Sequence, residues 1–279
     1  MRRRPLLAVL LAGLVAAPPA ARADAEELDA DAWCSRVAEA LRVTASMSAR
    51  AHMKVRRPGE RDWEFDLEML RQPHREGVRA VFEMREAGDP SSVVSELVVT
   101  PGEPLVNWYW DLQKRRWLAV KGIQGTDRFA ETLFRYEDLW LTDPSARRSG
   151  AVRWVEEEGR RWLLLESAPY HYYLRVETRI DPETSLPHHI RFIDNTGTPI
   201  REQYFESVET VDGRPFPKRV RLRDLVTGEE STLDWQDVRF EADIPPSYFD
   251  LSTIHDRITK GVDPVPLESV RERREPGGV

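Results

Sequence analysis

The side chains that could perform chemistry are few and scattered along this sequence. His188 and His189 are adjacent, and adjacent side chains on a strand point to opposite faces, so one metal ion could not bind both. His171 lies among tyrosines, a pattern typical of a strand edge. The chain has no G-x-S-x-G, no H-E-x-x-H, no cysteine pair and no phosphate-binding glycine loop. We therefore predict no catalytic residue, no metal site and no cofactor.

The charged runs have a simple surface interpretation. Glu156, Glu157 and Glu158 form a run beside a turn, which is usually a solvated face. Arg219, Arg221 and Arg223 share one face of a predicted strand. This stripe is either an outer strand face balanced by acids across a hairpin, or a docking patch for anionic head groups or an acidic partner. The acids that could balance it are Glu229, Glu230 and Asp234.

The composition is that of a folded, water-exposed protein. The chain has 279 residues, of which 41% are hydrophobic and 9% aromatic, and its formal net charge is −7. This hydrophobic content is too high for a disordered chain, and the acidic balance argues against nucleic-acid binding. A mean hydropathy of −0.54 excludes a polytopic membrane protein. The lone cysteine, Cys34, excludes an internal disulfide framework and fits a small buried residue on a helix.

The N-terminus has the pattern of an export signal. A basic stretch at Arg2 to Arg4 precedes the apolar run from Leu6 to Ala17, which is too short to span a bilayer. Ala21-Arg22-Ala23 provides a cleavage pattern, and no cysteine follows for lipidation. We expect a signal peptide at residues 1–23, one domain at 24–260 and a polar, disordered tail at 261–279. An uncleaved N-terminal anchor is the alternative.

Hydrophobic periodicity predicts one helix followed by many strands. Residues 26–47 lack Gly and Pro and carry an apolar stripe at helical spacing. Residues 51–56 and 63–69 then alternate apolar and charged side chains on either side of Pro58-Gly59, which predicts a hairpin with one apolar and one ionic face. In the expected register Lys54 pairs with Asp66, and Val55 pairs with Phe65.

Further strand-like runs follow, separated by turn signals and by one interruption. Residues 127–139 lack strand alternation, and Phe129, Leu133 and Tyr136 form a helical stripe after a possible Asp127 N-cap. We therefore predict a mainly β (α+β) fold. It is a half-open antiparallel β-barrel of about eleven strands, covered by an N-terminal helix and a short mid-chain helix.

The apolar face of such a sheet is either a filled core or a lipid-lined cavity, and the sequence leaves both open. Bulky aromatic and aliphatic side chains are expected to line it. The candidate ligand-binding residues are Trp63, Phe65, Leu67, Phe82, Trp108, Trp110, Phe129, Leu133, Phe134, Trp154, Trp162 and Trp235.

Several short motifs resemble those of a known family. These motifs are the hairpin around Trp63-Glu64-Phe65, the Y-E-D-L segment at residues 136–139, the I-D-x-x-x-x-L-P run at 180–187, the D-G-x-x-x-P hairpin at 212–217 and the I-P-x-x-x-F segment at 244–249. Together they are similar to the LolA/LolB-like outer-membrane lipoprotein-sorting proteins. The match is closest to a larger LolA-like subgroup associated with RND-type exporters. Gly125-Thr126-Asp127 departs from that pattern because it lies further upstream of Tyr136 than usual.

The resemblance implies a half-open barrel with helical lids, a hydrophobic cavity for acyl chains and no catalytic machinery. It implies a periplasmic carrier of lipoprotein acyl chains or another lipid toward the outer membrane, with transient contact to a membrane surface. An inner-membrane RND-type exporter is the implied protein partner. An accessory subunit of an envelope exporter and a lipid hydrolase on the same scaffold are the alternative functions.

Overall fold

A computed structural model describes residues 29–43, 45–74, 77–87, 94–100, 105–111, 116–123, 127–139, 149–167, 173–260 and 271–272. The predicted signal peptide lies outside these residues. The helical elements are α1 (Ala30–Ala40), η1 (Tyr136–Leu139), η3 (Pro246–Phe249) and α2 (Leu251–Lys260). The strands are β1 (Met47–Arg56), β2 (Trp63–His74), β3 (Gly77–Glu86), β4 (Val94–Thr100), β5 (Leu105–Asp111), β6 (Arg116–Ile123), β7 (Ser149–Glu157), β8 (Arg160–Ser167), β9 (Arg175–Ile180), β10 (Pro187–Ile193), β11 (Pro199–Val211), β12 (Arg214–Asp224), β13 (Glu230–Phe240), β14 (Ala242–Asp243) and β15 (Arg271–Glu272).

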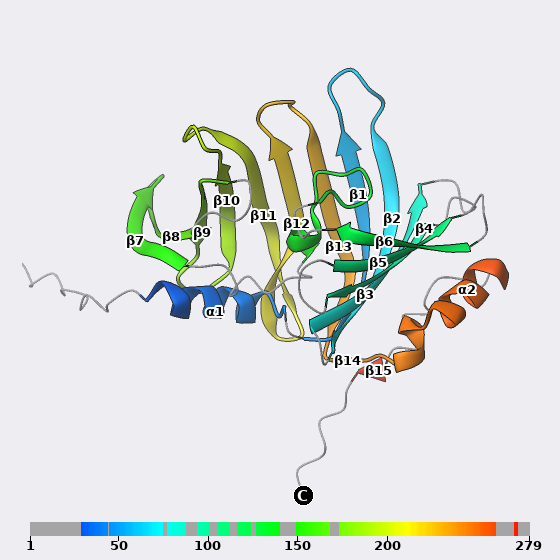
Figure 1. The fold of residues 1–279 in the computed structure, drawn as a ribbon. Helices are drawn as coiled ribbons and strands as arrows, with labels where there is room; N and C mark the ends of the chain where they lie inside the picture. The colour runs from blue at the N-terminus through cyan, green and yellow to red at the C-terminus, as the bar shows by residue number, and fades with distance from the viewer. Residues whose placement is uncertain are drawn as a thin grey trace, which may run out of the picture.

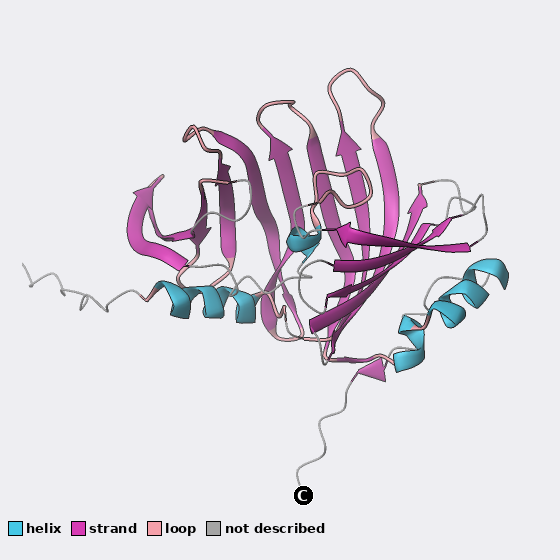
Figure 2. Ribbon diagram, in the orientation of Figure 1, coloured by secondary structure: helices cyan, strands magenta, loops and turns pink. Residues whose placement is uncertain are grey.

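Thirteen of the described strands form one antiparallel sheet, in the order β6-β5-β4-β3-β2-β1-β13-β12-β11-β10-β9-β8-β7. The sheet curves strongly, and β3 to β6 turn across one side of its concave face (Figures 1 and 2). The edge strands β6 and β7 lie at opposite ends of this order, so the barrel is open between them. The predicted half-open antiparallel barrel is confirmed, with thirteen strands instead of about eleven. β14 and β15 form a small second sheet, and β15 lies within the predicted tail.

The alternation of side chains divides the sheet into an apolar concave face and a charged convex face, as the sequence predicted. In β1, Ala51, Met53 and Val55 are buried, while His52 and Lys54 between them are more exposed. The expected pairing of β1 with β2 was wrong by two residues, because Lys54 lies opposite Glu64, and Val55 lies opposite Trp63. A shift of two keeps every side chain on its face, so apolar patterning alone does not distinguish the two registers.

Ion pairs cover the convex face, and they include arginines of the predicted stripe Arg219, Arg221 and Arg223 on β12. Arg219 Nε donates to Asp234 at 2.5 Å, and Arg221 Nη2 donates to Glu206 at 2.7 Å. Arg221 also lies 3.7 Å from Glu230. Two of the three arginines are therefore paired with acids of neighbouring strands, which supports the balanced outer face over a docking patch.

Helix α1 covers the lower rim of the concave face (Figure 1). Asp29 caps it by accepting a hydrogen bond from Asp31 N at 2.9 Å, and the apolar stripe through Trp33, Cys34 and Val37 is buried. The helix is shorter than the expected span of residues 26–47. It ends because Arg42 adopts a left-handed φ of 52°, which turns the chain toward β1. None of the described helices has the length and apolarity that crossing a bilayer requires.

A second cover, which the sequence reading did not predict, lies on the convex face. Helix α2 and η3 place Phe249 and Ile254 against Leu70 and Val81 on the outer side of β2 and β3. Arg79 holds this cover through its guanidinium, which lies 4.4 Å from the centroid of the Phe249 ring. The apolar side chains on the convex side of β2 and β3 are therefore packed against protein.

Candidate functional site

The concave face carries one continuous apolar cluster beneath α1 and residues 127–139. Six of the twelve predicted ligand-binding residues belong to it: Leu67, Phe82, Phe129, Leu133, Phe134 and Trp235. Each of the six is at most 4% exposed. The sheet supplies three of them and residues 127–139 supply the other three, so this mid-chain segment packs into the concave face.

Residues 127–139 form a tight turn followed by η1, so the predicted short mid-chain helix is present only at Tyr136–Leu139 and does not cover the whole span. Thr132 N donates to Phe129 O at 2.9 Å, and the two central residues, Ala130 and Glu131, both have positive φ. A further backbone hydrogen bond joins Phe129 N to Phe134 O at 2.8 Å. A helix would point Phe129 and Phe134 to well-separated sides, whereas the turn buries both rings completely. We call residues 127–139 the plug.

Charged side chains hold the first half of the plug to the rim of the sheet. Arg128 Nη1 donates to both carboxylate oxygens of Glu229, at 3.2 and 3.0 Å. Arg57 reaches the same carboxylate from the β1–β2 loop at 3.3 Å, and its Nη2 donates to Glu131 O at 2.6 Å. Glu229 is 5% exposed, so its charge is balanced within the protein by two guanidinium groups.

The second half of the plug is attached to β11 and β13. Leu133 N donates to the buried Ser231 hydroxyl at 3.0 Å, and Arg201 Nη2 donates to Leu133 O at 3.2 Å. Arg201 also forms a buried ion pair with Asp138, whose carboxylate accepts a further hydrogen bond from Arg135 N at 2.8 Å. Asp138 belongs to the Y-E-D-L motif, so this part of the motif serves to anchor the plug.

The environment of Arg201 keeps its guanidinium charged. Burial alone would lower the pKa of Arg201, but Asp138 and then Tyr173 and Glu137 raise it overall. The guanidinium also lies over the Phe192 ring at 4.4 Å. The plug is therefore attached to the sheet by polar contacts at several points, while its two phenyl rings fill apolar space.

The sequence reading missed these anchoring residues. Arg201 and Gln203 precede Phe205 in the same concave-facing row of β11, where the pattern predicts apolar side chains. A charged residue at an inward position of a strand was the available signal for a buried ion pair. Ser231 and Glu229 had no comparable signal.

The other six predicted ligand-binding residues are not part of this buried cluster, although Trp63, Phe65 and Trp154 lie opposite the concave-facing Val55, Met53 and Leu163. Phe65 packs against the edge of the concave cluster, while Trp63 and Trp154 are 44% and 38% exposed. Trp162 is buried on the opposite side of β8 from Leu163, stacked on His188. Trp108 and Trp110 lie in β5, and their side chains are outside the described residues. The backbone register places Trp108 opposite Leu97, which is opposite the convex-facing Val81.

The histidine pair lines a polar cavity of about 430 Å³ on the convex face. Both His188 and His189 line it, so the expectation of opposite faces was wrong. The register shift between Pro187 and His189 is a β-bulge that turns adjacent side chains to one side. No group of three or more His, Cys, Asp or Glu side chains suited to a metal occurs in the described part of the chain.

His189 is held in a network of polar contacts with the neighbouring strands. Its ring stacks on Tyr204 at 4.4 Å, and its Nδ1 lies 3.3 Å from Arg179 Nη1. Burial is the main reason that the pKa of His189 falls to about 4, although Glu202 opposes the shift. His189 is thus neutral at physiological pH, and its partners are those of a structural histidine.

The comparisons with known proteins agree with this architecture. A family model described as an uncharacterized protein matches residues 102–256, more than half of the chain. No curated protein matches the sequence. The fold resembles three solved structures: a DUF1329 family protein from Desulfovibrio piger, a putative outer membrane lipoprotein-sorting protein domain from Vibrio parahaemolyticus, and a LolA superfamily protein from Nitrosomonas europaea.

These likenesses extend over nearly the whole of each solved structure. The TM-scores are 0.66, 0.66 and 0.63 in that order, at 17%, 16% and 14% identity. The matches cover 80%, 81% and 81% of this chain, and 96%, 100% and 99% of the respective structures. At such identities the likeness concerns the fold. The chain belongs to the family of uncharacterized proteins whose model it matches over residues 102–256, and its fold resembles those of the three solved structures.

Proposed function

We propose that this protein is a non-enzymatic periplasmic carrier that shelters lipoprotein acyl chains or another lipid on its concave face, for transfer toward the outer membrane. The observation that carries the proposal is the plug. It fills the concave face with two phenyl rings and is attached by polar contacts with other parts of the chain. Such a cover can leave without breaking the strand pairing of the sheet.

Physical chemistry favours this arrangement for a carrier. An acyl chain in water costs about 0.8 kcal/mol for each exposed CH₂, so sheltering about fourteen methylenes is worth on the order of 10 kcal/mol gross. A carrier must release its cargo, so part of the favourable free energy of sheltering the acyl chain has to be offset. Displacing Phe129 and Phe134 from their apolar sites, and opening the ion pairs around them, would provide that offset.

Acyl-probe binding tests the proposal. We expect the protein to bind a fluorescent fatty acid, cis-parinaric acid, in competition with natural lipids. Phe134→Ala should increase the affinity about tenfold, because removal of the ring favours the open state by part of the roughly 3–5 kcal/mol that such a truncation costs. Phe249→Ala is the matched control, since this buried ring belongs to the separate cluster on the convex face. If neither the natural protein nor Phe134→Ala binds the probe, the carrier proposal fails.

A further inference from the structure

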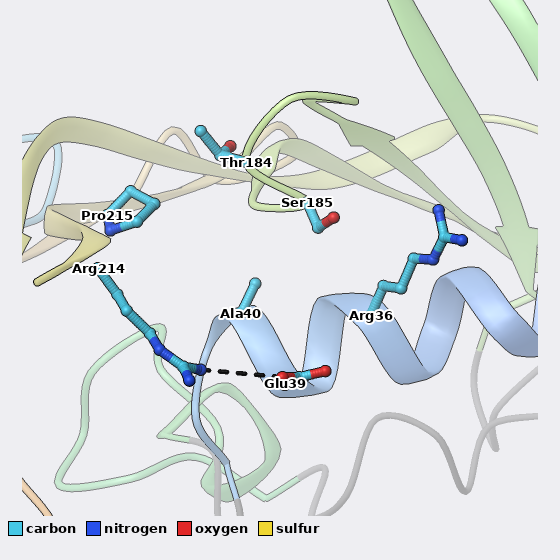
Figure 3. Close-up of a pocket in the computed structure, with 7 residues that line it drawn as sticks. All are labelled: Arg36, Glu39, Ala40, Thr184, Ser185, Arg214 and Pro215. Atoms are coloured by element: carbon cyan, nitrogen blue, oxygen red, sulfur yellow. Dashed lines mark ion pairs between the residues drawn. The ribbon is translucent and has the colours of Figure 1, made fainter.

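A slot between helix α1 and the turns at the rim of the sheet has no role in the account above. Its volume is about 240 Å³. Figure 3 shows α1 forming one wall and the β9–β10 turn and the start of β12 forming the other. The residues that line it are Arg36, Glu39, Ala40, Thr184, Ser185, Arg214 and Pro215.

The walls of the slot carry more positive than negative charge, although the whole chain has a net charge of −7. Arg36 and Arg214 come from α1 and β12, and Glu39 is the one acid among the lining residues. Glu39 lies 3.8 Å from Arg214, and both side chains are more than half exposed, so this pair is weak. The Arg36 guanidinium lies over the Trp33 ring at 4.7 Å.

The pKa of Arg42, near the slot, also reflects the excess of positive charge. Burial and then the positive charge of Arg214 lower the pKa of Arg42, while Asp212 and Glu241 oppose the shift. Arg214 is thus close enough to a second guanidinium to be repelled by it. An anion placed beside Arg214 would relieve this repulsion.

The turn that closes the slot supplies two hydroxyl groups. Thr184 Oγ1 accepts a hydrogen bond from Leu186 N at 3.3 Å, which leaves its own hydrogen free to donate. Ser185 adopts a left-handed φ of 59°, a strained conformation for a residue other than glycine, and its side chain lines the slot. This turn is the I-D-x-x-x-x-L-P motif, in which Asp181 Oδ1 accepts a hydrogen bond from Glu183 N at 3.0 Å.

The slot lies directly beside the apolar core. Ala40, Ser185 and Pro215 line it, and the residues that follow them in the chain are Leu41, Leu186 and Phe216, each at most 3% exposed. All three belong to the concave cluster. A molecule with an anionic group in the slot could therefore extend an apolar chain toward the concave face with little distance to cover.

We infer that this slot binds the anionic phosphodiester head group of the amphiphile that the protein carries. Arg36 and Arg214 neutralise its charge, and the hydroxyls of Thr184 and Ser185 donate hydrogen bonds to its oxygens. The inference rests on the proposed carrier function and adds a head-group preference to it. A free phosphate and a lipid head group share this chemistry, and the experiment below distinguishes the two ligands.

Isothermal titration calorimetry on the natural protein and its variants tests this inference. The ligands are dihexanoyl phosphatidylglycerol, dihexanoyl phosphatidylcholine and glycerol phosphate. We expect the anionic lipid to bind about tenfold more tightly than the zwitterionic lipid, and R36Q/R214Q to remove that preference while zwitterionic binding stays the same. Arg50→Gln is the matched control, because Arg50 is an exposed arginine paired with Asp237 on the convex face.

A second variant separates binding from folding. Ser185→Gly removes the hydroxyl and relieves the left-handed strain, so the melting temperature should stay the same or rise while affinity for the anionic lipid falls about threefold. A preference for the anionic lipid that survives in R36Q/R214Q overturns the inference and leaves the carrier proposal standing. Glycerol phosphate binding as tightly as the anionic lipid would assign the slot to free phosphates. Failure of both lipids to bind the natural protein contradicts the carrier proposal itself.

Discussion

Arg201→Met is expected to lower the free energy of unfolding by about 3–5 kcal/mol, because it leaves the Asp138 carboxylate buried without its cationic partner. The side chains of both residues are at most 5% exposed, so water cannot replace the lost contact. Arg201 also donates to Leu133 O, and this carbonyl would lose a hydrogen bond. Urea denaturation followed by circular dichroism measures the change.

A double-mutant cycle shows whether the loss comes from the pair. Asp138→Leu alone should also be strongly destabilising, but the double variant should be less destabilised than the sum of the single variants. Arg219→Gln provides the control, because Arg219 forms an exposed pair with Asp234 whose loss should cost less than about 1 kcal/mol. Additive effects of the two buried substitutions would show that Arg201 and Asp138 act independently, contrary to the geometry described above.

A disulfide that fixes the plug to the sheet is expected to stop lipid exchange. Leu133 N lies 3.0 Å from the Ser231 hydroxyl, so the plug and β13 approach each other closely at these two positions, where the cysteines are introduced. The buried Cys34 is replaced by alanine in this variant to prevent wrong pairing. Oxidised Leu133→Cys/Ser231→Cys should exchange a fluorescent acyl probe at least about a hundredfold more slowly than the same protein after reduction.

The oxidised and reduced forms share one sequence, so the comparison isolates the covalent attachment. Each single-cysteine variant should exchange the probe at the same rate before and after reduction. Equal exchange rates in the locked and reduced double variant would mean that lipid reaches the protein without movement of the plug.

The sequence predicted which face of β1 and β2 is apolar, but not the conformation of the irregular segments that connect the strands. Alternation identified the concave side of β1 and β2, whereas the register was wrong by two residues because an even shift preserves both faces. The loop between Arg56 and Trp63 determines the true register, and its six residues carry no periodic signal.

The errors at the site have related causes. The helical spacing of Phe129 and Leu133 was real, but tertiary packing of Phe134 favoured a turn over a helix. The β-bulge at Pro187 places His188 and His189 in one cavity, and the local sequence has no pattern that predicts such a bulge. The buried pair of Arg201 with Asp138 joins residues 63 positions apart, so it depends on the complete topology.

The measurement that tests the central claim most directly is native mass spectrometry of the protein purified from its native host, followed by organic extraction of bound molecules. The account predicts one acylated ligand per chain, and addition of lipid should convert any unliganded protein to the bound mass. A protein that carries no lipid, and remains unliganded when lipids are added, would show that the plug permanently fills the concave face and would contradict the carrier account.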